Sequence, residues 1–298
     1  MATPASPTAA TSKRRSWIRR PLARLLVLAA LVYLGWCGVM LFKQTDLVFP
    51  RHFANANIGE APRRPDLRQL WIDGAGGARV EAWLFLAGPI TPEQVERRPC
   101  VVIFHGNADL IDHMTEYADF YQSRGVHACL MEYRGYGRST GTPSERDVVA
   151  DATALIDMLA ARPEIDPKRI ILHGRSLGAA VAAQAAARRT PAALVLESPF
   201  LSVTHFASRF GVPGFLVKHP FRTDRVLPGL AAAGVPILIM HSREDEIIPF
   251  AHAQRLLALV PSARLVELTG GHNDMTLNQA AYEEAIDQLI APLLPDAK

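Results

Sequence analysis

The sequence predicts an α/β fold in which one mostly parallel, eight-stranded sheet is covered by helices on both faces. Short apolar, β-branched runs alternate with longer helical patterns over most of the 298-residue chain, and this alternation is typical of parallel strands joined by crossover helices. The first two runs are adjacent, which indicates one antiparallel pair. Polar, glycine-containing turns follow several runs, and the carboxyl ends of parallel strands are where such sheets bind ligands.

Each element is assigned from its hydrophobic period. The strand-like runs cover residues 68–72, 79–86, 100–105, 127–132, 170–174, 193–197, 236–241 and 264–268. The helical patterns cover residues 110–124, 146–161, 177–188, 251–259 and 278–292. Between Glu197 and Pro236 lie only 38 residues, so we expect no large lid domain there. The phenylalanines of this segment could form an apolar rim, or they could simply pack on the sheet.

The composition, 49% hydrophobic and 20% charged, suits one large globular domain. The net charge of +3 comes from the amino-terminal end, because without its six basic residues 26 Lys and Arg face 29 Asp and Glu. A slightly acidic remainder argues against a nucleic-acid-binding surface. The six basic residues are Lys13, Arg14, Arg15, Arg19, Arg20 and Arg24.

An uncharged apolar segment follows this basic cluster. Residues 25–42 carry no charge and, at about 1.5 Å per residue, just span a hydrocarbon core. We therefore divide the chain into a basic, disordered cytoplasmic tail (1–23), a single transmembrane signal anchor (24–42), a linker (43–66) and the globular domain (67–298). The positive-inside rule places that domain on the non-cytoplasmic side of the membrane.

Two alternatives for the apolar segment stay open, a cleaved secretory signal and a buried helix. A signal peptide should have a shorter apolar region that ends at small residues in an A-x-A pattern. Here the run ends in M-L-F-K-Q, which favours an anchor that is not cleaved.

The three cysteines show neither a metal-binding spacing nor a disulfide framework. Cys100 and Cys129 both lie in strand-like runs, so we expect buried thiols, with a bridge between them as the alternative. We expect no metal site and no organic cofactor.

The pentad Gly174-Arg175-Ser176-Leu177-Gly178 stands where a predicted strand becomes an alanine-rich helix. A serine in such a turn adopts a strained backbone that lifts its hydroxyl clear of the sheet, and glycines two positions away avoid a clash. Ser176 is therefore the candidate nucleophile. The alternative is an ordinary turn bounded by glycines.

A serine hydroxyl needs a base to accept its proton and an acid to orient that base. After the strand at 236–241, three carboxylates compete, and Asp245 is preferred to Glu244 and Glu246 because a turn back to the core follows it. Glu197, at the end of another strand, is the alternative acid.

His272 is the candidate base. It follows two glycines and comes one helix and one strand after the acid. The histidines at other strand ends, His105, His173 and His241, are more simply explained as packed side chains.

The oxyanion formed during acyl transfer needs two N–H donors. Leu177 begins the helix after the nucleophile, so its amide has no partner within the helix. Asn107 follows the strand at 100–105 in the turn His105-Gly106-Asn107. We expect these two amides to form the oxyanion hole, with a plain turn as the alternative role for Asn107. In the stretch that follows the next strand, Arg134 and Arg138 are expected to pair with carboxylates.

In this order the motifs resemble those of the membrane-anchored α/β-hydrolase-domain proteins. The matching stretches are H-G-N-A, Y-R-G-Y-G-x-S, G-x-S-L-G, S-P-F, D-E-I-I-P and G-H-N-D, preceded by D-L-V-F-P, and they run from about Leu41 to Ile290. The resemblance implies the α/β-hydrolase fold and a serine esterase, thioesterase or lipase-like activity on a small-molecule or lipid ester. It also implies Ser176, Asp245 and His272 as the catalytic triad.

Two other functions share this scaffold. A serine peptidase would be expected to bring an extra gating domain, which does not fit in this length. A non-catalytic binding protein would be favoured by loss of a triad residue, yet all three are present.

Overall fold

The computed structural model describes residues 13–88, 96–274 and 279–294, and in this part of the chain the predicted sheet of eight strands is confirmed. The strand order is β1-β2-β4-β3-β5-β6-β7-β8. Strand β2 pairs antiparallel with β1 and β4, while all later neighbours pair in parallel. The strands are β1 Leu67–Gly74, β2 Ala78–Phe85, β3 Arg98–Phe104, β4 His127–Met131, β5 Ile165–Arg175, β6 Ala193–Glu197, β7 Ile237–Ser242 and β8 Arg264–Leu268.

All five predicted helices are present, four of them as α-helices near the expected bounds and the first as a 3₁₀ turn followed by α3. The segment after β6 holds two further helices, α6 and α7, that were not predicted from the sequence. The Ser202 hydroxyl begins α6 by accepting a hydrogen bond from the His205 amide at 3.0 Å. The α-helices are α1 Lys13–Val48, α2 Arg51–Ala54, α3 Thr115–Gln122, α4 Glu145–Ala160, α5 Leu177–Ala186, α6 Val203–Arg209, α7 Thr223–Ala232, α8 Ala251–Leu259 and α9 Ala280–Ile290.

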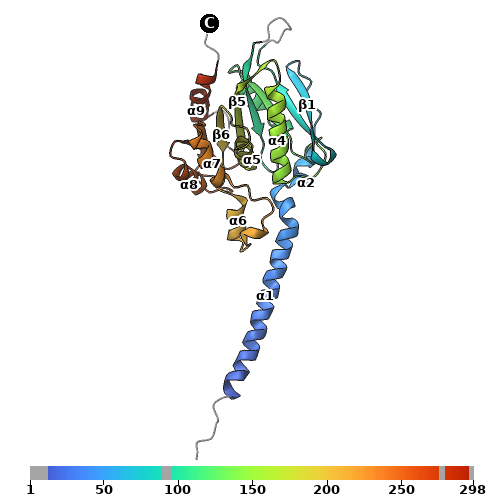
Figure 1. Ribbon diagram of the computed structural model, residues 1–298, viewed down its shortest axis with the longest axis vertical. Helices are drawn as coiled ribbons and strands as arrows, with labels where there is room; N and C mark the ends of the chain where they lie inside the picture. The colour runs from blue at the N-terminus through green and yellow to red at the C-terminus, as the bar shows by residue number, and fades with distance from the viewer. Residues whose placement is uncertain (1–12, 89–95, 275–278, 295–298) are drawn as a thin grey trace, which may run out of the picture. The chain divides into compact units, whose positions relative to one another are not determined.

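Alternate residues of each central strand face opposite layers of the core. On β3, Val102 packs with the layer formed by α4, α5, α7 and α8, whereas Val101 packs with the layer formed by α3 and α9. Figure 1 looks onto the side of the sheet that carries α4 and α5. Both faces are therefore covered, as the nearly continuous apolar strands predict.

The chain divides into two compact units, Met1–Lys43 and Gln44–Lys298. Within the described residues, Pro21–Ala54 is the one stretch long and apolar enough to cross a membrane, a property that signal sequences share. Of the predicted disordered tail, residues 1–12 lie outside the described residues, and residues 13–23 are helical as the first part of α1. In the segment that the sequence predicts as a linker, Phe49 is buried and its ring meets that of Phe221 edge to face at 6.1 Å between centroids.

The expected buried thiols are confirmed, because Cys100 and Cys129 are both free and fully buried. Burial raises the pKa of both thiols above the ordinary value.

Helix α5 crosses the end of β3 so closely that only glycine fits at its second residue. A Cβ on Gly178 would stand 2.0 Å from the carbonyl oxygen of Phe104, far inside van der Waals contact. We therefore expect Gly178→Ala to destabilise the protein by at least roughly 1–3 kcal/mol and to lower the melting temperature measured by differential scanning fluorimetry.

Gly229→Ala in α7 is the matched control, since an added Cβ there meets no atom within 4 Å. This variant should be stabilised by roughly 0.5–1 kcal/mol, as for Gly→Ala in an open helix. Equal melting temperatures for the two variants would contradict the close approach of α5 to β3.

Candidate active site

Ser176 stands between the end of β5 and the start of α5 in a conformation that L-residues rarely adopt, with φ 55° and ψ −115°. Its amide donates to the Glu197 carbonyl at 2.8 Å, which ties the turn to β6. A Cβ on Gly174 would lie 2.0 Å from the Gly178 carbonyl oxygen. The steric need for both glycines of the pentad, expected from the sequence, is therefore confirmed.

The structure brings the three candidate catalytic side chains together from three loops. His272 Nε2 lies 3.1 Å from Ser176 Oγ, and His272 Nδ1 lies 2.8 Å from Asp245 Oδ2. His272 and Asp245 are both buried, and Ser176 is half-buried. Because the carboxylate only accepts, Nδ1 carries a proton, and the neutral ring then has its Nε2 lone pair free for the serine proton.

Asp245 is held as a carboxylate by several donors. Burial alone raises its pKa, but hydrogen bonds from His241 and His272 and from the Ile248 amide outweigh that effect and hold the pKa well below its usual range. The amides of Ile247 and Ile248 donate to Oδ1 at 3.0 and 2.7 Å. These donors therefore favour the ionised form of the preferred acid.

The loop that carries His272 is held at its backbone. Glu246 accepts the His272 amide at 3.0 Å, Glu244 accepts the Gly270 amide at 3.1 Å, and the Arg175 guanidinium donates to the His272 carbonyl at 2.8 Å. None of these three contacts was predicted from the sequence. The one sequence signal for these contacts was Arg175, a charged residue between an apolar strand and the helix.

Glu197, the alternative acid, lies in a separate buried cluster. Its carboxylate accepts from the Tyr117 hydroxyl at 3.1 Å and pairs with Arg175 and His173 at 3.3 and 3.4 Å. Burial raises its pKa, but the neighbouring His173 ring and the Arg175 guanidinium lower it further than burial raises it. The oxygen that bonds the His272 ring belongs to Asp245, so the geometry favours Asp245 over Glu197.

The two candidate oxyanion donors belong to two segments next to the nucleophile, the start of α5 and the turn after β3. Leu177 is the first residue of α5, so its amide has no acceptor within the helix. The turn after β3 also lies close to the nucleophile, since a Cβ on Gly106 would stand 3.9 Å from Ser176 Cβ. Asn107 follows directly in that turn and is exposed.

Arg134 and Arg138 pair with carboxylates, as predicted. Arg134 binds the buried Asp151 through two nitrogens. Arg138 donates to Glu81 at 2.7 Å and to Asp112 at 3.0 Å. Both guanidinium groups therefore serve to hold the loop after β4.

The segment between β6 and β7 divides its aromatic side chains between core and surface. Phe200 and Phe221 are buried, whereas Phe210 and Phe215 are 61% and 86% exposed. Among the described residues, no group of three or more His, Cys, Asp or Glu side chains is arranged to hold a metal ion.

Comparison with known proteins finds relatives over most of the chain. The chain is 33% identical to an uncharacterised protein of Mycobacterium tuberculosis over 85% of this chain and 90% of that protein. It is 30% identical to the α/β-hydrolase domain-containing protein WAV2 of Arabidopsis thaliana over 70% of this chain and 73% of that protein. A family model described as serine aminopeptidase, S33, matches residues 95–218.

Among solved structures, the chain resembles a thermophilic esterase of Thermogutta terrifontis with a TM-score of 0.62 and 17% identity, over 82% of this chain and 99% of that one. At such low identity the likeness shows the fold alone. Together with the relatives above, it leads to one conclusion: the chain belongs to the α/β-hydrolase family of serine hydrolases.

Proposed function

We propose that this protein hydrolyses carboxylic esters or thioesters of lipids or acylated molecules, with Ser176, His272 and Asp245 as its catalytic triad. The observation that carries the proposal is the unbroken chain of contacts from Ser176 Oγ to His272 Nε2, at 3.1 Å, and from His272 Nδ1 to Asp245, at 2.8 Å. Nucleophile, base and orienting acid are the minimum set for acyl transfer through a serine.

In the proposed mechanism, His272 Nε2 accepts the Ser176 proton as Oγ attacks the acyl carbonyl. The amides of Leu177 and Asn107 donate to the oxyanion that forms, and the ionised Asp245 stabilises the imidazolium. His272 then protonates the departing alcohol or thiol. Water, activated by the same ring, attacks the acyl-serine and releases the acid.

Two features favour an apolar acyl substrate. Phe210 and Phe215 present large aromatic surfaces to solvent on the short segment that follows β6. The carboxyl end of β6 lies beside the nucleophile turn. The apolar stretch Pro21–Ala54 would hold the hydrolase unit at a bilayer. A bilayer supplies lipid esters and acylated proteins directly.

We further propose that the amino-terminal helix is an uncleaved anchor that places residues 44–298 on the non-cytoplasmic side. The six basic residues before the apolar segment support this orientation.

A peptidase is the second candidate, because the matching family model is described as a serine aminopeptidase. The same triad would attack a peptide carbonyl. A carboxylate near the site would be needed to bind the free amino group of the substrate. Hydrolysis of aminoacyl p-nitroanilides at rates above those of acyl p-nitrophenyl esters would favour the peptidase over the esterase.

Ser176→Ala and His272→Ala should each lower ester turnover by about 1,000-fold or more, since triad residues act as a unit. Turnover of p-nitrophenyl esters by the full-length protein in detergent measures this effect. Ser208→Ala, an exposed serine of α6, is the control and should retain normal turnover. A fluorophosphonate probe should label the wild type but not Ser176→Ala, and labelling of neither would favour a non-catalytic binding protein.

Asp245→Asn should destabilise the protein more at neutral pH than in acid. A carboxyl whose pKa is lowered by folding stabilises the protein above its unfolded pKa of about 3.9, and that contribution is lost as the pH falls towards the folded-state pKa. The difference in unfolding free energy between wild type and Asp245→Asn should therefore be constant above about pH 5 and narrow below about pH 4, by up to ~1.4 kcal/mol per pH unit. Urea unfolding at a series of pH values measures it, and a gap that widens in acid would contradict the assignment.

A reporter fused after Lys298 should lie outside the cytoplasm. Alkaline phosphatase fused there should be active and green fluorescent protein dark, while the intact mass of the membrane-extracted protein should include the apolar segment. A fluorescent fusion would refute the orientation, and a mass that lacks the segment would show a cleaved signal.

A further inference from the structure

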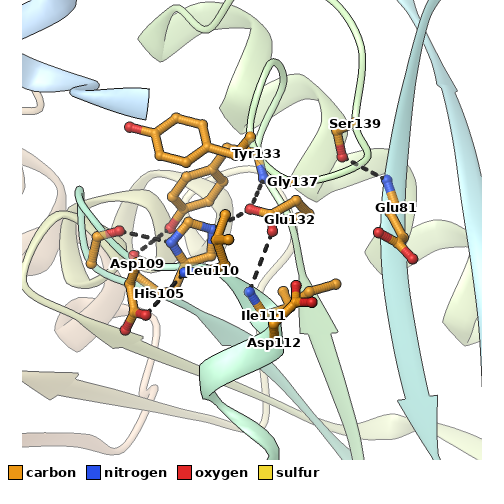
Figure 2. A network of polar contacts seen from close by, with 12 residues as sticks. Glu81, His105, Asp109, Leu110, Ile111, Asp112, Glu132, Tyr133, Gly137 and Ser139 are labelled. Atoms are coloured by element: carbon orange, nitrogen blue, oxygen red, sulfur yellow. Dashed lines mark hydrogen bonds and ion pairs between the residues drawn. The ribbon is translucent and has the colours of Figure 1, made fainter. Parts of the chain in front are cut away.

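The turn after β3 is bound by side chains from the segment that follows β4, as Figure 2 shows. His105 Nε2 lies 2.7 Å from Glu132 Oε1, and the Tyr133 hydroxyl donates to the His105 carbonyl at 2.8 Å. The Tyr136 hydroxyl donates to the Asn107 carbonyl at 2.7 Å. The Y-R-G-Y-G motif thus binds the turn that contains Asn107, the proposed second oxyanion donor.

The His105 ring is bonded on both sides by acceptors. Its Nδ1 lies 2.7 Å from the Gly106 carbonyl oxygen, and its Nε2 faces the Glu132 carboxylate. A carbonyl oxygen cannot donate, so Nδ1 must carry a proton. Burial lowers the pKa of His105, but the charge and hydrogen bond of Glu132 raise it above its ordinary value, which agrees with an imidazolium paired with a carboxylate.

Glu132 is itself fixed in place. It is fully buried, and its oxygens accept the Tyr133 amide at 2.9 Å and the Ile111 amide at 3.3 Å. Gly137 leaves room for it, because a Cβ there would stand 2.8 Å from Glu132 Oε2. The Glu132 side chain is thus held by two amides while it faces the His105 ring.

The contact at Gly106 decides where the Asn107 amide points. In a trans peptide the C=O of one residue and the N–H of the next point in opposite directions, and the described residues contain no cis peptide bond. Because Nδ1 of His105 holds the Gly106 carbonyl, the Asn107 N–H is directed away from the His105 ring. The same peptide lies beside the nucleophile, since a Cβ on Gly106 would stand only 3.9 Å from Ser176 Cβ.

We propose that His105, held by Glu132, is a positioning residue that locks the Gly106–Asn107 peptide in the orientation that gives the oxyanion its second donor. This inference rests on the proposed function. Without a proton on Nδ1, the ring lone pair would face the Gly106 carbonyl and repel it. The peptide would then be free to rotate, and the Asn107 N–H would no longer be held ready for the oxyanion.

Two substitutions of His105 separate this role from a merely structural one. Asn carries its amide nitrogen two bonds beyond Cβ, as Nδ1 does, so His105→Asn can still donate to Gly106. Gln carries it three bonds beyond Cβ, as Nε2 does, so His105→Gln keeps the contact with Glu132 and loses the one with Gly106.

For the full-length protein in detergent, His105→Gln should lower kcat by roughly 100- to 1,000-fold, the loss typical of one oxyanion donor. KM should change little, since the donor acts in the transition state. His105→Asn should keep a kcat at least about 10-fold higher than His105→Gln. Equal losses in both variants, or a larger loss in His105→Asn, would overturn the proposal.

A second pair of variants applies if the His105 variants do not fold. Glu132→Gln removes the charge that holds His105, and Glu81→Gln removes another fully buried carboxylate of the same region (Figure 2), which binds Arg138 and not the turn. At similar melting temperatures, kcat should fall at least about 10-fold further in Glu132→Gln than in Glu81→Gln, and equal kcat values would overturn the proposal. A different result would overturn the proposed function itself, namely ester hydrolysis by Ser176→Ala at the wild-type rate.

Discussion

The backbone of Ser176 is held in a left-handed conformation, and the rest of the site depends on what holds it there. A residue at φ 55° is strained, so the strain must be opposed by packing on both sides. Two glycines allow this, because α5 can then lie against the ends of β3 and β5 with no Cβ between them. The same close approach places the first residue of α5 directly after the serine and the turn after β3 next to it.

Buried carboxylates support this edge of the sheet, and each has its own donors. Asp245 binds the ring of His272, Glu197 binds Arg175 and Tyr117, and Glu132 binds His105. An unpaired buried charge would cost several kcal/mol, so each carboxylate fixes the side chains around it. Glu197 also accepts the Ser176 amide through its backbone, and Arg175 continues from Glu197 to the His272 carbonyl. One buried glutamate therefore links the nucleophile turn to the loop of the base.

The pattern of the chain was enough to predict the strands but not the helices of the short segment after β6. Strands such as β6 are continuously apolar because both faces are covered, whereas α6 and α7 lie at the surface with mixed side chains. Helix α7 also contains Pro228, which lowers its helical signal. The burial of Phe221 and the exposure of Phe215 could not be separated either, since one residue type serves both environments.

By itself the sequence determined the fold class and the order of its elements, because hydrophobic period and glycine placement are local properties of the chain. It also singled out Ser176, Asp245 and His272 as candidates, since each follows a strand whose carboxyl end must lie at the same edge. Only the tertiary structure decided that Asp245 and not Glu197 meets the ring of His272, and that the His105 ring meets the carboxylate of Glu132. Those outcomes depend on contacts between segments 27 or more residues apart, and the distances and acceptor directions across such contacts are set by packing and not by any local pattern.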